Sequence, residues 1–169
     1  MDQPTPSRPA ASGERSPGAR LMSLWGRLGG RPGGRLLFSL AFGWMVPYSG
    51  TIRARIRRLQ PGDAVVELLD RRRVRNHLGS IHAIALANLG EMATGLALNT
   101  ALPPDARAIL VSLDVRYVKK ARGRLTALCR CPTPQVDDDR DVEVACEIRD
   151  PSEEVVTTVR ATWRVGPRR

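Results

Sequence analysis

Hydrophobic and polar positions alternate over residues 52–57, give way to a short and then a long apolar segment, and alternate again in four more segments. Residues 52–57 are expected as a strand because side chains along a strand point alternately to its two faces, and residues 64–69 are expected as the second strand. Residues 81–98 hold no proline and are long enough for a helix of about five turns. The last four segments are also expected as strands, over residues 109–117, 125–131, 142–148 and 155–165. This order predicts an α+β domain in which one antiparallel sheet wraps around one long central helix, with the last four strands paired as a meander.

The composition divides the chain into four parts. Residues 1–20 are rich in Pro, Ser, Gly, Ala and Arg, offer little to bury, and are predicted to form a disordered basic tail. Residues 21–47 are expected as a helical segment packed on the domain. Residues 48–165 are expected to form the domain itself, and residues 166–169 a short tail.

The segment 21–47 is interrupted by glycines and a proline, and it has two interpretations. Its second apolar stretch, residues 36–46, is too short to cross a membrane, which takes about 20 residues. One interpretation is a pair of short helices that cover the mouth of a binding tunnel. The other is an interfacial helix in peripheral contact with a membrane, with three arginines toward the lipid headgroups: Arg27, Arg31 and Arg35.

The net charge of +10 at pH 7 first suggests nucleic acid as a partner, because basic surfaces attract phosphate backbones. Nearly all of the positive charge is arginine, and no zinc-ligand pattern, RNA-binding aromatic motif or helix-turn-helix is visible. We therefore expect no nucleic-acid partner. Acidic ligands such as coenzyme A remain attractive for the same electrostatic reason.

The three cysteines, Cys129, Cys131 and Cys146, are an odd number with no secretory signal ahead of them. They are expected to be packed free thiols in a reducing cytosol. No metal site is expected, because further ligands at suitable spacing are missing. The lack of a signal peptide and of a spanning helix favours a cytoplasmic location.

The long helix is apolar on every side, which is typical of a buried helix. Between His82 and Thr100 it carries one charged residue, Glu91. Burying an unpaired carboxylate is costly, so Glu91 must be paired, protonated, or facing a cavity. Ala87 and Gly95, one turn away on either side, leave room for a ligand beside it. Glu91 is therefore the first candidate for a functional residue.

The segment ahead of the helix offers a second set of candidates. A helix beginning near residue 81 presents free backbone N–H groups that can polarise a carbonyl or bind an anion. Ser80 is the expected N-cap. His82, in the first turn, is as suited to orienting structure as to catalysis.

Together these residues resemble the signature of the hot-dog thioesterase superfamily. In the branch that includes the phenylacetate-pathway thioesterases the pattern is Asn-x-x-Gly-x-x-His, followed nine positions later by an acidic residue. This chain has Asn76, Gly79 and His82, with Glu91 in the acidic position. A closer resemblance is to DUF4442, an uncharacterised bacterial hot-dog family, and it is carried by Pro47-Tyr48-Ser49-Gly50 and by residues 76–82 and 88–91.

The resemblance implies a hot-dog fold and an acyl-coenzyme A thioesterase that releases a free acid and coenzyme A. Glu91 would act as general base on a water or attack the carbonyl itself. Asn76 would hold the water or Glu91, His82 would orient the thioester carbonyl, and Gly79 would help to bind the substrate. The amide of Ala83 would stabilise the oxyanion. No cofactor is implied beyond the coenzyme A of the substrate.

The resemblance also implies partners. The substrate would be an acyl-coenzyme A or an acyl-carrier thioester, and the site would lie between the subunits of a homodimer or a dimer of dimers. Four basic residues, which would otherwise form a solvated turn, are suited to the coenzyme A phosphates: Lys119, Lys120, Arg122 and Arg124.

One departure from the family pattern keeps an alternative open. Active thioesterases of this type have His-Gly-Gly, where this chain has His82-Ala83-Ile84, and alanine does not permit the close approach that glycine does. The alternative is a non-catalytic hot-dog protein that binds acyl thioesters or lipids. A dehydratase of the acyl-carrier type is less suited, because its His-Phe-Pro-Gly segment is missing here.

Overall fold

The computed structural model describes residues 16–168. Most of the tail expected over residues 1–20 lies outside that range, although the first helix begins at Pro17, before the boundary expected at residue 21. The helices are α1 (Pro17–Leu28), α2 (Gly34–Met45), α3 (Pro47–Gly50) and α4 (Ala83–Ala101), with a 3-10 turn at Arg72–Val74. The strands are β1 (Arg55–Gln60), β2 (Asp63–Leu68), β3 (Ala106–Tyr117), β4 (Leu125–Arg130), β5 (Arg140–Arg149) and β6 (Val155–Pro167).

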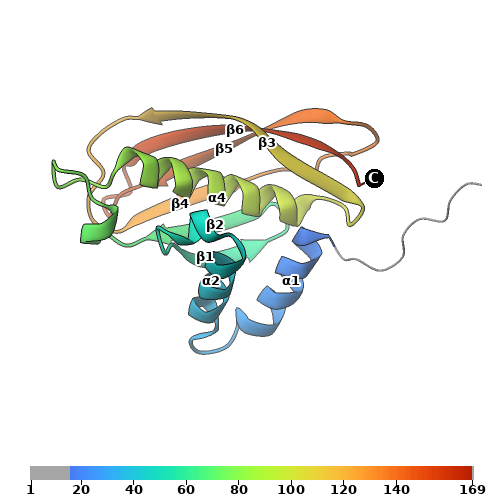
Figure 1. The fold of residues 1–169 in the computed structure, drawn as a ribbon, viewed down its shortest axis with the longest axis horizontal. Helices are drawn as coiled ribbons and strands as arrows, with labels where there is room; N and C mark the ends of the chain where they lie inside the picture. Colours follow the sequence, from blue (N-terminus) through green and yellow to red (C-terminus); the bar gives the residue numbers. More distant parts are fainter. Residues whose placement is uncertain (1–15, 169) are drawn as a thin grey trace, which may run out of the picture.

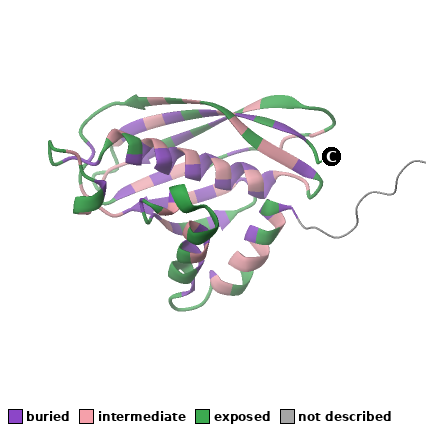
Figure 2. Cartoon of the chain, viewed as in Figure 1, coloured by how far each residue is buried: buried purple, intermediate pink, exposed green. Residues whose placement is uncertain are grey.

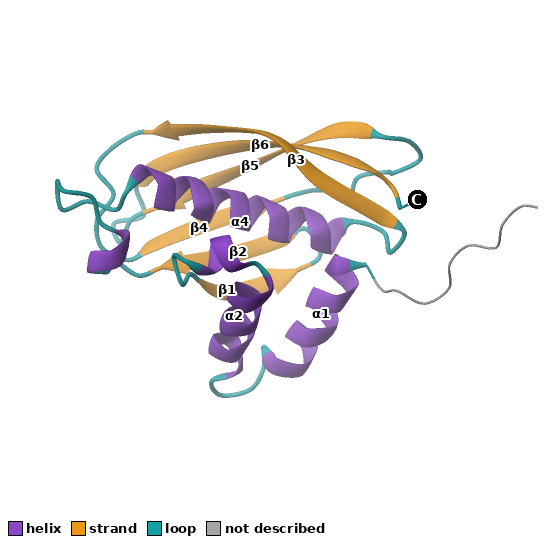
Figure 3. Ribbon diagram, in the orientation of Figure 1, coloured by secondary structure: helices purple, strands orange, loops and turns teal. Residues whose placement is uncertain are grey.

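The six strands form one antiparallel sheet in the order β1-β2-β4-β5-β6-β3, and the sheet curves around α4 (Figures 1 and 3). The α+β expectation is therefore confirmed. The meander is confirmed for β4, β5 and β6 but is wrong for β3. That strand pairs with β6 along its whole length, and β4 pairs with β2 instead. The connection after β3 thus passes from one end of the sheet toward the other.

The core lies between α4 and the concave face of the sheet (Figure 2). Its fully buried members come from both layers and include Leu89, Leu98, Leu68, Leu125, Ile148 and Val159. Gly90 lets the helix approach the sheet closely, since a Cβ built on it would lie 2.4 Å from a side-chain carbon of Val159. The sequence predicted a helix that is apolar on every side, and α4 is accordingly buried around most of its circumference.

The start of α4 differs from the expectation. The helix begins at Ala83, and its N-cap is His82, whose Nδ1 accepts a hydrogen bond from the Ile84 N–H at 3.1 Å. Ser80 is buried ahead of the helix and is not the cap. The prediction of Ser80 is therefore wrong, because an acceptor closer to the first turn takes the same role.

Helices α1 and α2 lie side by side below β1 (Figure 1). Phe38 of α2 is fully buried and meets the ring of Trp25 edge-on, with 5.0 Å between the ring centroids. The Ser39 hydroxyl accepts from the Ile56 N–H of β1 at 2.9 Å and donates to the Arg35 carbonyl at 2.7 Å. This side chain therefore satisfies a backbone donor on an edge strand and fixes α2 to the sheet.

The opposite face of α2 is apolar and exposed, with exposed fractions of 58% for Leu37 and 84% for Trp44. Within residues 16–168, no helix is long and apolar enough to cross a membrane.

All three cysteines are buried and free, as predicted. Cys129 on β4 stands opposite Cys146 on β5. Burial raises the pKa of both thiols, that of Cys146 to about 12, so both are poor nucleophiles near neutral pH.

Candidate functional site

Glu91 lies in the middle of α4 on the side that the sheet leaves uncovered, and its side chain is half-buried. Burial raises the pKa of its carboxyl group, while a hydrogen bond with the Ser49 hydroxyl of α3 acts in the opposite direction. Because desolvation is the larger effect, the carboxylate is a stronger base than one in water. Two cavities meet at this side chain, one on each side of the contact between α3 and α4.

The first cavity, of about 190 Å³, extends from Glu91 toward the C-terminal half of α4. Gly95 forms part of its wall and leaves space above the indole of Trp163. Half of the remaining lining is apolar and comes from the N-terminal segment: Pro17, Leu21, Phe42 and Val46. This cavity is suited to an aliphatic group next to the carboxylate.

The second cavity, of about 460 Å³, extends from Glu91 toward the N-terminal half of α4 and includes Ala87 and Asn88. The Asn88 amide donates through Nδ2 to the Tyr48 carbonyl at 3.2 Å. Its Oδ1 is buried and has no hydrogen-bond partner among residues 16–168. Asn88 therefore ties α4 to the Tyr48 backbone and shapes the wall of the cavity beside the Glu91 carboxylate.

The loop before α4 gathers the other residues expected at the site. The Asn76 Oδ1 accepts from the Leu78 N–H at 3.0 Å and from the Ser80 N–H at 3.1 Å. Gly79 has a φ of 69°, in the left-handed region that glycine adopts without strain. Asn76 and Gly79 thus give the loop its shape and bring it to the start of α4.

His82 is exposed at the first turn of α4, and the neighbouring Ala83 carbonyl accepts from the Tyr117 hydroxyl at 3.1 Å. Glu91 is nine residues further along the same helix, which corresponds to about 13.5 Å at 1.5 Å per residue. A single chain therefore brings Asn76, His82 and Ala83 together but keeps them away from Glu91.

The basic segment between β3 and β4, residues 119–124, is only partly available to a ligand. Lys119 forms ion pairs with Asp150, at 2.8 Å, and with Glu154. Arg124 lies 3.6 Å from a Glu67 carboxylate oxygen. Lys120 and Arg122 are exposed and form no ion pair with any residue in the range 16–168. A phosphate-binding role for all four basic residues stays a prediction.

Three residues at the site were not predicted from the sequence: Ser49, Asn88 and Tyr117. Ser49 belongs to the Pro47-Tyr48-Ser49-Gly50 motif, which marked the family without indicating a role. Asn88 carries the same signal as Glu91, a polar residue within an apolar helix, and that signal could have found it. In the part of the chain that the structure describes, no group of three or more His, Cys, Asp or Glu side chains is placed to hold a metal ion.

The comparison with protein families matches residues 34–165 to a domain of unknown function, DUF4442. The chain belongs to this family. A comparison with curated proteins found no match. Among solved structures, a genomics target with 28% identity superimposes with a TM-score of 0.74 over 87% of this chain and 97% of its own.

Two further solved structures carry a functional name. A Pseudomonas aeruginosa protein of unknown function, described as a probable thioesterase, has 22% identity and a TM-score of 0.68 over 79% of this chain and 93% of its own. A variant of a Staphylococcus aureus thioesterase has 20% identity and a TM-score of 0.63 over 72% of this chain and 99% of its own. The DUF4442 chain thus has the hot-dog fold that its sequence predicts.

Proposed function

We propose that this DUF4442 protein hydrolyses acyl-coenzyme A thioesters to a free acid and coenzyme A. The observation that carries the proposal is the Glu91 carboxylate, which lies half-buried on the central helix between two cavities and has a raised pKa. The thioesterase names of structural neighbours support it by analogy of fold.

In the simplest mechanism, Glu91 removes a proton from a water molecule as the water oxygen attacks the thioester carbonyl carbon. The Ser49 hydroxyl holds the Glu91 carboxylate in position through their hydrogen bond. The C–S bond then breaks, and the departing coenzyme A thiolate takes the proton from Glu91. A second route, in which the Glu91 carboxylate itself attacks the carbonyl and water later cleaves the anhydride, uses the same residues.

The oxyanion would be stabilised by a second copy of the chain. The helix start of a partner, with its Ala83 N–H and its His82, would face Glu91 across the interface. Edge strand β3 supports such a homodimer, because its side chains Ile109 and Val111 are 56% and 52% exposed and its outer edge is unpaired within the described residues. Ile84, exposed at the start of α4, would be covered by the same contact.

The coenzyme A phosphates would bind at the basic segment after β3, residues 119–124. Lys120 and Arg122 offer an ammonium and a guanidinium group that form no ion pair within residues 16–168, whereas Lys119 and Arg124 would have to exchange theirs. We therefore expect the first two to contribute more to the affinity for coenzyme A than the last two.

The test is thiol release from acyl-coenzyme A substrates of graded chain length, with wild-type protein and Glu91→Gln. Removing a general base costs about a hundredfold or more in turnover, so the variant should lose at least that much. Glu143→Gln, at an exposed position on β5, is the matched control and should keep wild-type turnover. A wild-type protein that hydrolyses no chain length would overturn the proposal.

A specific observation favours one alternative, a non-catalytic protein that binds acyl thioesters. Ala83 stands where active relatives of this type have glycine. If the wild type binds an acyl-coenzyme A without turnover, Ala83→Gly distinguishes the two cases. Turnover gained by that variant would show that the side chain blocks the oxyanion position, and continued inactivity would support a binding protein.

A further inference from the structure

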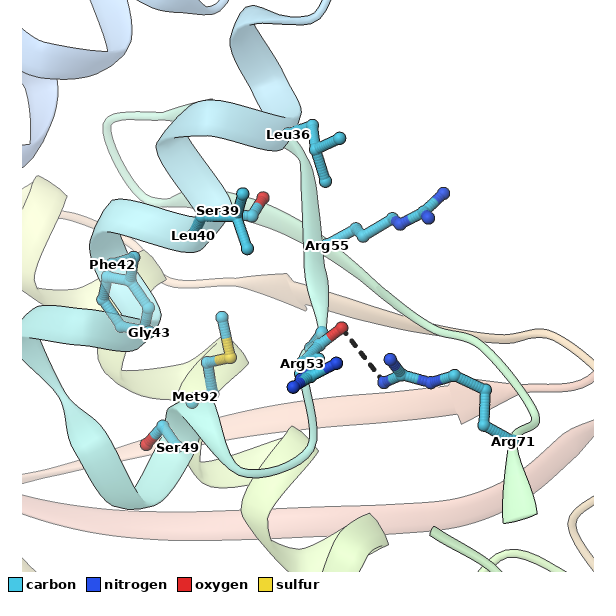
Figure 4. Close-up of a pocket in the computed structure, with 12 residues that line it drawn as sticks. Leu36, Ser39, Leu40, Phe42, Gly43, Ser49, Arg53, Arg55, Arg71 and Met92 are labelled. Atoms are coloured by element: carbon cyan, nitrogen blue, oxygen red, sulfur yellow. Dashed lines mark hydrogen bonds between the residues drawn. The ribbon is translucent and has the colours of Figure 1, made fainter. Parts of the chain in front are cut away.

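A third cavity, of about 220 Å³, lies on the other side of α3 from Glu91. It is bounded by α2, by α3 and by the chain that leads into β1 (Figure 4). Ser49, Phe42 and Met92 separate it from the cavities around Glu91. The thioester mechanism proposed above uses no residue that is exclusive to this cavity.

One half of the cavity is apolar. Phe42 and Met92 form its buried floor, and Leu36 and Leu40 stand at its edge with exposed fractions of 47% and 57%. Leu36 and Leu40 continue into the exposed apolar face of α2. An aliphatic chain placed here would cover side chains that otherwise contact water.

The other half is lined by arginines. Arg53 comes from the turn before β1, Arg55 is the first residue of β1, and Arg71 reaches across from the segment after β2 (Figure 4). The Arg71 Nη2 donates to the carbonyl groups of Ile52 and of Arg53. Its Nε is buried and has no hydrogen-bond partner among residues 16–168, so the positive charge of Arg71 is only partly compensated there.

In the part of the chain that the structure describes, no acidic side chain lines this cavity. The nearest carboxylates along the chain are already engaged: Asp70 contacts Arg75 at 2.6 Å, and Glu67 lies 3.6 Å from Arg57. Repulsion from Arg53 and Arg55 adds to burial in lowering the pKa of Arg71. Like charges are thus gathered around an apolar cavity without a counter-charge from the described residues.

The backbone of Arg53 adds an independent observation. Its φ is 48°, in the left-handed region that a long side chain adopts only at a cost in free energy. The turn before β1 thus holds an arginine where glycine or asparagine would be less strained. The strained conformation puts the Arg53 guanidinium at the cavity, as Figure 4 shows.

We propose that this cavity binds an amphiphilic oxyanion, a carboxylate or a phosphate monoester that carries an aliphatic chain. The head group would contact the guanidinium groups of Arg53 and Arg55, next to the positive charge of Arg71. The chain would lie against Met92 and Leu40 and leave the cavity along α2. This site does not depend on thioester hydrolysis, since it requires neither a thioester nor Glu91.

The test is isothermal titration of the full-length protein with decyl phosphate and with decanoate, each below its micelle concentration. Binding of either supports the oxyanion site, and the tighter of the two identifies the head group. Inorganic phosphate, which has no chain, and decanol, which has no charge, should each bind at least about tenfold more weakly, because each keeps one half of the contacts. Equal binding by either of these would overturn the proposal.

The location is tested with Arg53→Gln/Arg55→Gln, which should weaken binding at least about tenfold. Arg71 is left unchanged because it also holds backbone carbonyl groups. The matched control Arg27→Gln/Arg31→Gln removes the same charge from residues that do not line the cavity, and it should bind as the wild type does. Equal losses in both double variants would show attraction by net charge alone and would overturn the site. A loss in Glu91→Gln as large as that in Arg53→Gln/Arg55→Gln would move the ligand to the Glu91 cavities.

Discussion

Phe38 is the side chain that we expect to hold the N-terminal helices on the hot-dog domain. It has no exposed surface, it belongs to α2, and it packs edge-on against Trp25 of α1 with an interplanar angle of 78°. Truncating a buried phenylalanine to alanine costs about 3–5 kcal/mol, because transfer and cavity effects add. The free energy of unfolding of a native domain is about 5–15 kcal/mol in total, so Phe38→Ala should remove a large part of it.

Urea unfolding followed by circular dichroism measures this loss, and a double-mutant cycle with Trp25→Ala separates its parts. The edge-to-face ring pair should appear as a coupling free energy of about 0.5–1.5 kcal/mol. Leu37→Ala is the matched control on the same helix, since Leu37 is 58% exposed and surface changes are usually within about 0.5 kcal/mol. If α1 and α2 unfold together with the sheet, the slope of the free energy against urea stays at the wild-type value.

A cost below about 1 kcal/mol for Phe38→Ala would refute this account, because α2 could then detach without loss of the domain. The experiment also bears on the site. Phe42 of α2 and Ser49 of α3 line the cavities beside Glu91, so a variant whose α2 detaches should lose acyl-coenzyme A turnover at urea concentrations where β-sheet signal remains.

Three further predictions use other parts of the structure. Burial raises the pKa of Glu91 above its ordinary value of 4.5, so the native protein binds a proton at this carboxylate more tightly than the unfolded chain does. The free energy of unfolding therefore falls as the pH rises through the pKa that Glu91 has in the folded protein. Glu91→Gln should therefore match the wild type in melting temperature near pH 4 and exceed it at pH 7, and equal melting temperatures at both pH values would contradict this. Gly90→Ala should cost about 1–3 kcal/mol in urea unfolding, because its Cβ would lie 2.4 Å from a β6 side chain, and a neutral substitution would show that α4 can move away. Leu37→Ser/Trp44→Ser should reduce co-sedimentation with phosphatidylglycerol vesicles. The reason is that the exposed apolar face of α2 belongs to a segment, residues 16–62, that contains no acidic residues. If the wild type does not bind the vesicles, the interfacial interpretation is excluded.

The elements were predictable from the sequence because their signals are local. Residues 81–98 were expected as the central helix, and α4 covers Ala83–Ala101. Its last turn was missed because Thr100 continues the helix, with its hydroxyl donating to the Leu96 carbonyl at 2.9 Å. The place of β3 was not predictable in this way, since alternation indicates a strand but not its neighbour. The exposed side chains of Ile109 and Val111 fit the position of β3 at the edge of the sheet.

The candidate site also has one part that was predictable from local sequence and another that was not. Glu91 was predictable because a charge within an apolar helix conflicts with burial whatever the fold. Ser49 comes from a separate four-residue helix, and nothing in the local pattern indicates that it reaches Glu91. The arginine cluster of the third cavity joins Arg53 to Arg71, eighteen positions apart, through the β1–β2 hairpin. Whether these two arginines lie side by side depends on the strand register and not on the residues themselves.

The cap at the start of α4 determines which hydrogen atom the His82 ring carries. Because Nδ1 accepts the Ile84 N–H, the neutral ring has its proton on Nε2, and the outward edge of the imidazole is a donor. This donor stands next to the backbone N–H of Ala83, the first residue of α4. Any group that meets this end of the helix must therefore bring lone pairs, as a carbonyl oxygen or an anion does. His82 can therefore hold an acceptor in place, while the task of accepting a proton is left to Glu91.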